Sequence, residues 1–158
     1  MDTTYIAVGR ALLATQILET ALVPIYELYR VSTEPDRLAK TQGYLSAGAF
    51  KVPTSTIVKM LSDKGSIAAD LETRIKAYID NRHLLVHRWT QEHGVPATEK
   101  DFLLLAMLAL KVEMEARELS RILARYVVKH SGPDWAAANL DDYKLKMAGI
   151  FLEAHTDV

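Results

Sequence analysis

The sequence predicts an all-α protein, for three reasons. Its 158 residues include only seven glycines and five prolines. The stretches between them are rich in Ala, Leu, Glu, Lys and Arg, and apolar residues recur in them every three to four positions, as on one face of a helix. The helices this predicts are long, their linkers are short, and there is no internal repeat. We therefore expect one domain over 1–158, folded as an up-and-down four-helix bundle with additional short helices.

The first half of the chain predicts one long helix and one short one. The long helix is expected over 5–29 and ends before a Ser-Thr-Glu-Pro-Asp cluster; Pro24 inside it predicts a kink. The segment 37–53 carries no clear prediction, because two glycines weaken any helix there and a Val-Pro pair ends it. A short helix is expected over 56–61.

The second half predicts three helices. The third long helix of the bundle is expected over 67–89, with Ser66 placed to cap its first free amide groups. The next begins at Thr98, three residues before an aspartate in a capping-box arrangement, and continues to His130. A Ser-Gly-Pro run over 131–133 follows, in which the glycine caps the helix and the proline ends it, and a last helix is expected over 134–153.

Composition limits the function classes. The chain has no cysteine, which excludes a disulfide framework, an iron–sulfur cluster and thiol catalysis, and its net charge of -1 argues against a surface built for polyanions. The N-terminus lacks the basic start of a signal peptide. The longest unbroken apolar run, 102–110, is about half of the roughly 20 residues that cross a bilayer. We expect a cytoplasmic protein with no membrane partner.

Arg82 is the most informative anomaly. Advancing by about 100° per residue along the helix at 67–89 puts Arg82 in the middle of an apolar arc. A buried, unpaired guanidinium is very costly, so Arg82 must meet a carboxylate, a subunit boundary or an anionic ligand. Glu19 and Glu115 stand on apolar faces of their own helices and are both candidate partners, in which case the pair could be purely structural. The apolar members of the arc are Leu71, Ile75, Tyr78, Leu85, Val86 and Trp89.

A histidine-rich basic patch surrounds Arg82. Three of the five histidines fall within 82–93, and His83 and His87 are four residues apart. Three interpretations compete for this patch. A His pair at this spacing can bind a metal, but no cysteine and no third ligand beyond Asp80 accompany it. A histidine that titrates near neutral pH, beside an arginine that holds phosphate, can cleave RNA without a metal. The third interpretation is a binding or dimer surface without chemistry.

One geometric problem accompanies the RNA interpretation. Arg82 and His87 are five residues apart, which separates them by about 140° around a regular helix. They therefore cannot meet one ligand side by side on such a helix. Either the helix is distorted between them, or the ligand lies in a groove between two copies of the protein.

The run from Asn81 to Arg88, Asn-Arg-His-Leu-Leu-Val-His-Arg, resembles the signature of the HEPN superfamily. That signature is an arginine, a polar residue and then a histidine a few residues on, late in the third long helix of an all-helical bundle. Arg82, His83 and His87 stand at these positions. The layout of the chain, with Glu19 on a long first helix, is similar as well.

The resemblance implies a metal-independent endoribonuclease without a cofactor, which leaves a 2′,3′-cyclic phosphate. It implies a homodimer whose two Arg/His motifs line one cleft. In that cleft His87 would be the acid or base, Arg82 would hold the phosphate and His83 would orient them. The supporting residues would be Asn81, Arg88, Trp89, Glu19 and Glu115.

Members of this superfamily recur in toxin–antitoxin, abortive-infection and CRISPR effector systems, so RNA and an antitoxin protein are the expected partners. In the toxin branch a tyrosine commonly stands two places after the histidine. Trp89 stands there instead, which argues against control by adenylylation at this place and favours a packing or base-stacking role. The alternative to an enzyme is a non-catalytic nucleotide-binding or protein-interaction module with the same fold.

Overall fold

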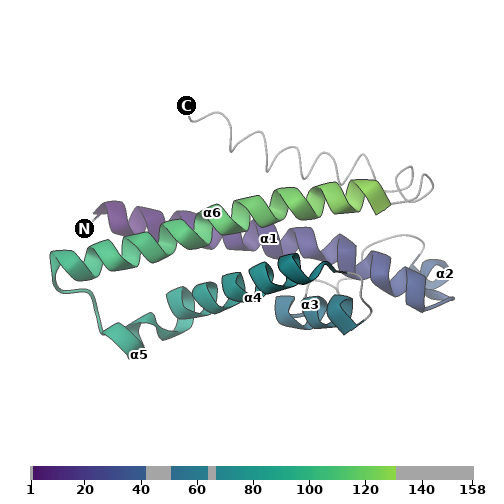
Figure 1. The fold of residues 1–158 in the computed structure, drawn as a ribbon, viewed down its shortest axis with the longest axis horizontal. Coiled ribbons are helices and arrows are strands. Elements are labelled where there is room, and N and C mark those ends of the chain that lie inside the picture. The colour runs from purple at the N-terminus through teal and green to yellow at the C-terminus, as the bar shows by residue number, and fades with distance from the viewer. Residues whose placement is uncertain (1, 42–50, 64–66, 131–158) are drawn as a thin grey trace.

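The all-α prediction is confirmed in the computed structural model, which describes residues 2–41, 51–63 and 67–130 (Figure 1). Within these ranges every regular element is a helix. The segment 42–50, Ser66 and the helix expected over 134–153 lie outside the described residues. The elements are α1 (Asp2–Thr33), α2 (Arg37–Thr41), α3 (Thr54–Asp63), α4 (Ala69–His83), the π-helix η2 (Leu84–Arg88), α5 (Trp89–His93) and α6 (Glu99–His130).

The two longest helices, α1 and α6, lie side by side and run in the same direction (Figure 1). The Thr4 hydroxyl donates to the backbone oxygen of Phe102, and further along both helices the Arg10 guanidinium lies 3.0 Å from a Glu113 carboxylate oxygen. Each helix buries a seam with the alternating four-and-three spacing of a coiled coil. The seams are Ala7, Ala11, Ala14, Leu18, Ala21 and Ile25 on α1, and Leu105, Ala109, Val112, Ala116, Leu119 and Leu123 on α6.

Helix α4 covers one side of this pair and runs antiparallel to it. Its early residue Arg74 pairs with Glu115, whereas its late residue Asn81 accepts a hydrogen bond from Lys111, which comes earlier in α6. The short helix α3 packs against both α1 and α4. This antiparallel packing places the late part of α4 against the middle of α1, where Glu19 lies.

Helix α1 is longer at both ends than expected and continues through Pro24, which is fully buried. By length and composition alone, the stretch Thr3–Val31 would also be long and apolar enough to cross a membrane. In this fold the same stretch supplies the α1 seam, and its buried apolar residues belong to the hydrophobic core.

The start of α6 forms the predicted capping box. The Thr98 amide donates to a carboxylate oxygen of Asp101 at 2.9 Å, and the Asp101 amide donates back to the Thr98 hydroxyl at 3.3 Å. The Thr98 hydroxyl also donates to this carboxylate, at 2.8 Å. That hydrogen bond, together with those from the amides of Thr98 and Ala97, lowers the pKa of Asp101 from its ordinary value. By contrast, α4 begins at Ala69 rather than at 67, and Ala68 before it makes no side-chain cap.

Candidate functional site

The helix expected over 67–89 is interrupted by the π-helix η2 immediately after Arg82 and His83. The backbone N–H of Trp89 bonds the oxygen of Leu84, five residues earlier, instead of the usual four. This wider turn moves His87 around the helix axis, so that its Nε2 lies 3.3 Å from Nη1 of Arg82. The expected separation of about 140° therefore does not hold, because the helix is distorted between the two residues. π-helical turns of this kind are frequent at functional sites.

Arg82 is held from two sides. Its Nη2 donates to a carboxylate oxygen of Glu19 at 3.1 Å, and its Nη1 lies against His87. Its Nε is buried and has no hydrogen-bond partner among the described residues. Of the two candidate carboxylates, Glu19 is the partner; Glu115 pairs instead with Arg74, two turns earlier on α4.

The ion pair is reachable from solvent. The Arg82 side chain is 30% exposed and that of Glu19 is 42% exposed. His87 and His83 are exposed, and their ring centroids lie 5.0 Å apart. Because a guanidinium can only donate, Nε2 of His87 is the acceptor in this arrangement, which places the proton of a neutral ring on Nδ1. A carboxylate, a guanidinium and an imidazole thus stand in a row at the surface.

Two buried residues form the floor of this row, and sequence reasoning did not assign them to the site. The Tyr78 hydroxyl donates to the hydroxyl of Thr15 at 3.0 Å. Burial raises the pKa of Tyr78 to about 12. Tyr78 precedes Arg82 by four residues and Thr15 precedes Glu19 by four, so each polar pair shares one helix face. This spacing is the signal in the sequence that could have identified them.

Trp89 packs into the core, whereas Val86 and Arg88, the two residues next to His87 in sequence, do not. Trp89 is buried, as expected of a packing residue, and its ring lies 4.4 Å from that of His93 between centroids. Val86 was expected in the apolar arc but is exposed, because the extra residue of the π-helical turn rotates it outward. Arg88 pairs with Glu92 at 3.0 Å.

Asn81 lies at the edge of the site. Its amide nitrogen donates to the backbone oxygen of Ala77 at 2.7 Å, and its oxygen accepts from Lys111 at 3.4 Å. Neither Asn81 nor Arg88 hydrogen-bonds Arg82 or His87 within the described part of the chain. The structure therefore brings together Glu19, Arg82 and His87, with His83 beside them, and places the remaining expected residues around or away from them.

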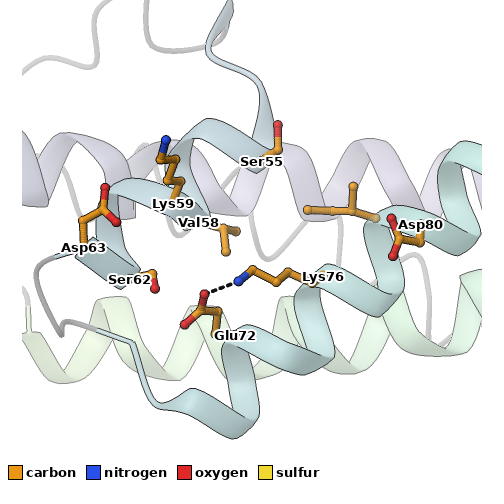
Figure 2. Close-up of a pocket in the computed structure, with 9 residues that line it drawn as sticks. Ser55, Val58, Lys59, Ser62, Asp63, Glu72, Lys76 and Asp80 are labelled. Atoms are coloured by element: carbon orange, nitrogen blue, oxygen red, sulfur yellow. Dashed lines mark hydrogen bonds and ion pairs between the residues drawn. The ribbon is translucent and has the colours of Figure 1, made fainter.

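Asp80, the only third ligand suggested for a metal held by His83 and His87, lines a pocket of about 570 Å³ between α3 and α4. Figure 2 shows it there with Lys59, Asp63 and the ion-paired Glu72 and Lys76. Across the ranges that the structure describes, no three His, Asp or Glu side chains come together as metal ligands.

Comparison with known proteins adds no assignment. No family model matches the chain, and neither a curated protein nor a solved structure matches it.

Proposed function

We infer that the chain is a metal-independent endoribonuclease, with Glu19, Arg82 and His87 as its reacting groups. The observation that carries this proposal is the row of a carboxylate and an imidazole on either side of one guanidinium. Cleavage of RNA by its own 2′-hydroxyl needs a group that removes a proton, a group that supplies one and a cation between them for the phosphate. These are the three groups in the row.

Each of the three groups has its own role in the proposed reaction. The phosphate sits against Arg82, whose fork of N–H donors matches phosphate oxygens. The carboxylate of Glu19 removes the proton of the 2′-hydroxyl, whose oxygen then attacks phosphorus. The phosphate also displaces His87 from Nη1 of Arg82, so that Nε2 of His87 is free to carry a proton. As the bond from phosphorus to the 5′ oxygen breaks, His87 gives that proton to the oxygen. The products are a 2′,3′-cyclic phosphate and a free 5′-hydroxyl, and the ring of His83 holds that of His87 in place.

The resemblance to the HEPN signature supports this proposal and implies a biological role for the protein. On that basis the protein is a cytoplasmic enzyme of a defence or toxin–antitoxin system, with RNA as substrate and an antitoxin protein as a further partner. A non-catalytic nucleotide-binding or interaction module is the second candidate, and it is favoured by one observation: the Arg82–Glu19 contact is also a complete ion pair without any ligand.

The test is cleavage of a single-stranded RNA by the purified protein in EDTA. We expect cleavage that leaves a cyclic phosphate, and we expect His87→Ala to abolish it without changing the circular dichroism spectrum, because His87 is exposed. His93→Ala, a matched histidine on α5, should retain activity. RNA binding without cleavage would support the second candidate, and activity lost in EDTA and restored by zinc would support a metal enzyme.

A further inference from the structure

A pocket of about 360 Å³ lies beside Glu19, between α1 and the segment that leads into α3, and we call it the Glu19 pocket. Its volume falls within the roughly 300–1,000 Å³ of small-molecule sites. Glu19 belongs both to this pocket, which it lines, and to the row of reacting groups, where it accepts the hydrogen bond of Arg82. The lining residues are Gln16, Glu19, Thr20 and Val23 on α1, and Lys51, Val52, Pro53 and Thr54 at the start of α3.

The α1 wall of the Glu19 pocket offers hydrogen-bond acceptors. Its four residues follow one another at intervals of three, one and three, so they share one face of the helix. Oε1 of Glu19 accepts from Arg82, whereas Oε2 accepts no hydrogen bond within the described ranges. The Thr20 hydroxyl donates its proton to the backbone oxygen of Gln16 at 2.9 Å, which leaves the hydroxyl oxygen as an acceptor.

Two polar groups at the Glu19 pocket are unused. The side-chain amide of Gln16 and the ammonium of Lys51 are exposed, and neither has a partner in the parts of the chain that the structure describes. An amide both donates and accepts, whereas an ammonium only donates. Val52 and Pro53 add an apolar side against which a flat ring can lie. The pocket therefore suits a planar group that carries donors and acceptors along its edge, as a nucleobase does.

The order of groups around a ribose matches the order of groups in the protein. Three consecutive carbons of the sugar carry the base, the 2′-hydroxyl and the 3′ phosphate. The Glu19 pocket, the Glu19 carboxylate and the Arg82 guanidinium follow one another in the same order. We propose that the Glu19 pocket binds the base of the nucleotide whose 2′-hydroxyl attacks, and that it prefers guanine and uracil to adenine and cytosine. This inference rests on the proposed roles of Glu19 and Arg82.

The preference follows from Lys51. An ammonium can pair only with an acceptor, and guanine and uracil present a carbonyl oxygen where adenine and cytosine present an amino group. A donor that faces another donor leaves both groups unpaired, which is costly in a partly enclosed site. One good pair of hydrogen bonds to a base edge discriminates by about 5- to 150-fold. A single lysine should reach the lower end of this range.

The test is the binding of the four nucleoside 3′-monophosphates, measured by calorimetry in EDTA. These molecules contain the base, the 2′-hydroxyl and the phosphate, but no bond that the reaction cleaves. We expect the guanosine and uridine compounds to bind at least about fivefold more tightly than the other two. Lys51→Met should remove this preference by weakening only the favoured pair. Lys59→Met, at an exposed lysine of α3 outside the Glu19 pocket, loses the same charge and should keep the preference.

Four nucleotides that bind within twofold of one another, or that fail to bind at millimolar concentration, would overturn the proposal. So would an equal loss for all four in Lys51→Met, because Lys51 would then hold the phosphate and not the base. The proposed function fails separately. A base preference without any RNA cleavage would keep the Glu19 pocket as a nucleotide site and reject the ribonuclease, and cleavage without a base preference would do the reverse.

Discussion

Replacing Glu19 by Gln separates a reacting carboxylate from a structural ion pair. The substitution keeps the size of the side chain and removes its charge and its basicity. The Arg82–Glu19 pair is 30% and 42% exposed, so solvent screens it. Exposed and half-exposed pairs contribute about 0.2–1 kcal/mol to the free energy of unfolding. For a domain of this size, 1 kcal/mol corresponds to about 2–4 °C of Tm.

The expected effect on cleavage is much larger. Loss of a general base lowers the rate by about 10²- to 10⁴-fold, which is roughly 3–5 kcal/mol of transition-state stabilisation. We therefore expect Glu19→Gln to melt within about 4 °C of the wild type and to lose at least 100-fold in kcat/KM on RNA. The two measurements are a thermal melt by circular dichroism and a cleavage assay in EDTA.

A matched interhelical ion pair provides the control. Arg74→Gln breaks the Arg74–Glu115 contact between α4 and α6, where Arg74 is 40% exposed and Glu115 is 28% exposed. It should lower Tm by a similar amount and leave cleavage unchanged. Cleavage within threefold of wild type in Glu19→Gln would refute its role as a base, and a fall in Tm above 10 °C would show that the pair is chiefly structural.

Three further predictions concern the scaffold. Thr98→Ala removes the hydroxyl that caps α6 and should lower the free energy of unfolding by about 1 kcal/mol in urea denaturation; an unchanged midpoint would contradict the capping role. Ala116→Leu should overfill the seam between α1 and α6 and cost about 1–3 kcal/mol in the same assay, whereas a neutral result would mean that the helices can separate there. The third is a pH dependence. Burial in the folded protein raises the pKa of Tyr78 to about 12, whereas the pKa in the unfolded chain is near 10. The free energy of unfolding that comes from this difference is full below pH 10 and is lost as pH rises toward 12, a fall of roughly 2–3 kcal/mol. Tyr78→Phe should lose about 1 kcal/mol at pH 7 with its hydrogen bond to Thr15, and its melts from pH 9 to 11.5 should fall less steeply than those of the wild type; parallel curves would contradict the assignment.

The fold was largely predictable from the sequence because its signals are local. The Thr98 capping box and the loop at Gly94, whose φ is 75°, mark the start of α6 and the end of α5. The alanine-rich seam on α1, with its alternating four-and-three spacing, is likewise a property of one segment, and its small side chains allow close packing against another helix. The identity of its partner helix, α6, and the parallel direction of the two helices depend on contacts between residues about a hundred positions apart. Local sequence patterns do not contain this information.

The site was predictable only in part. Arg82, His83 and His87 follow from an apolar arc and a histidine cluster, which are properties of one segment. The π-helical turn does not follow from the segment itself, because Leu-Leu-Val-His-Arg has the composition of an ordinary helix. The wider turn depends on how this segment packs against the rest of the fold. The choice of Glu19 over Glu115 depends in turn on the register between α4 and its two neighbours, which no single segment encodes.

The parallel pairing of α1 with α6 has a consequence for synthesis of the chain on the ribosome. Residues that pack together across these helices are 98 to 103 positions apart, so the partner of α1 does not yet exist when α1 emerges. At roughly 5–20 residues per second, α1 waits on the order of 5–20 s with its alanine and leucine seam exposed to water. Contacts this distant in sequence also slow folding after release, since a long loop must close first. The apolar seam of α1 therefore stays uncovered on the nascent chain until α6 has been made.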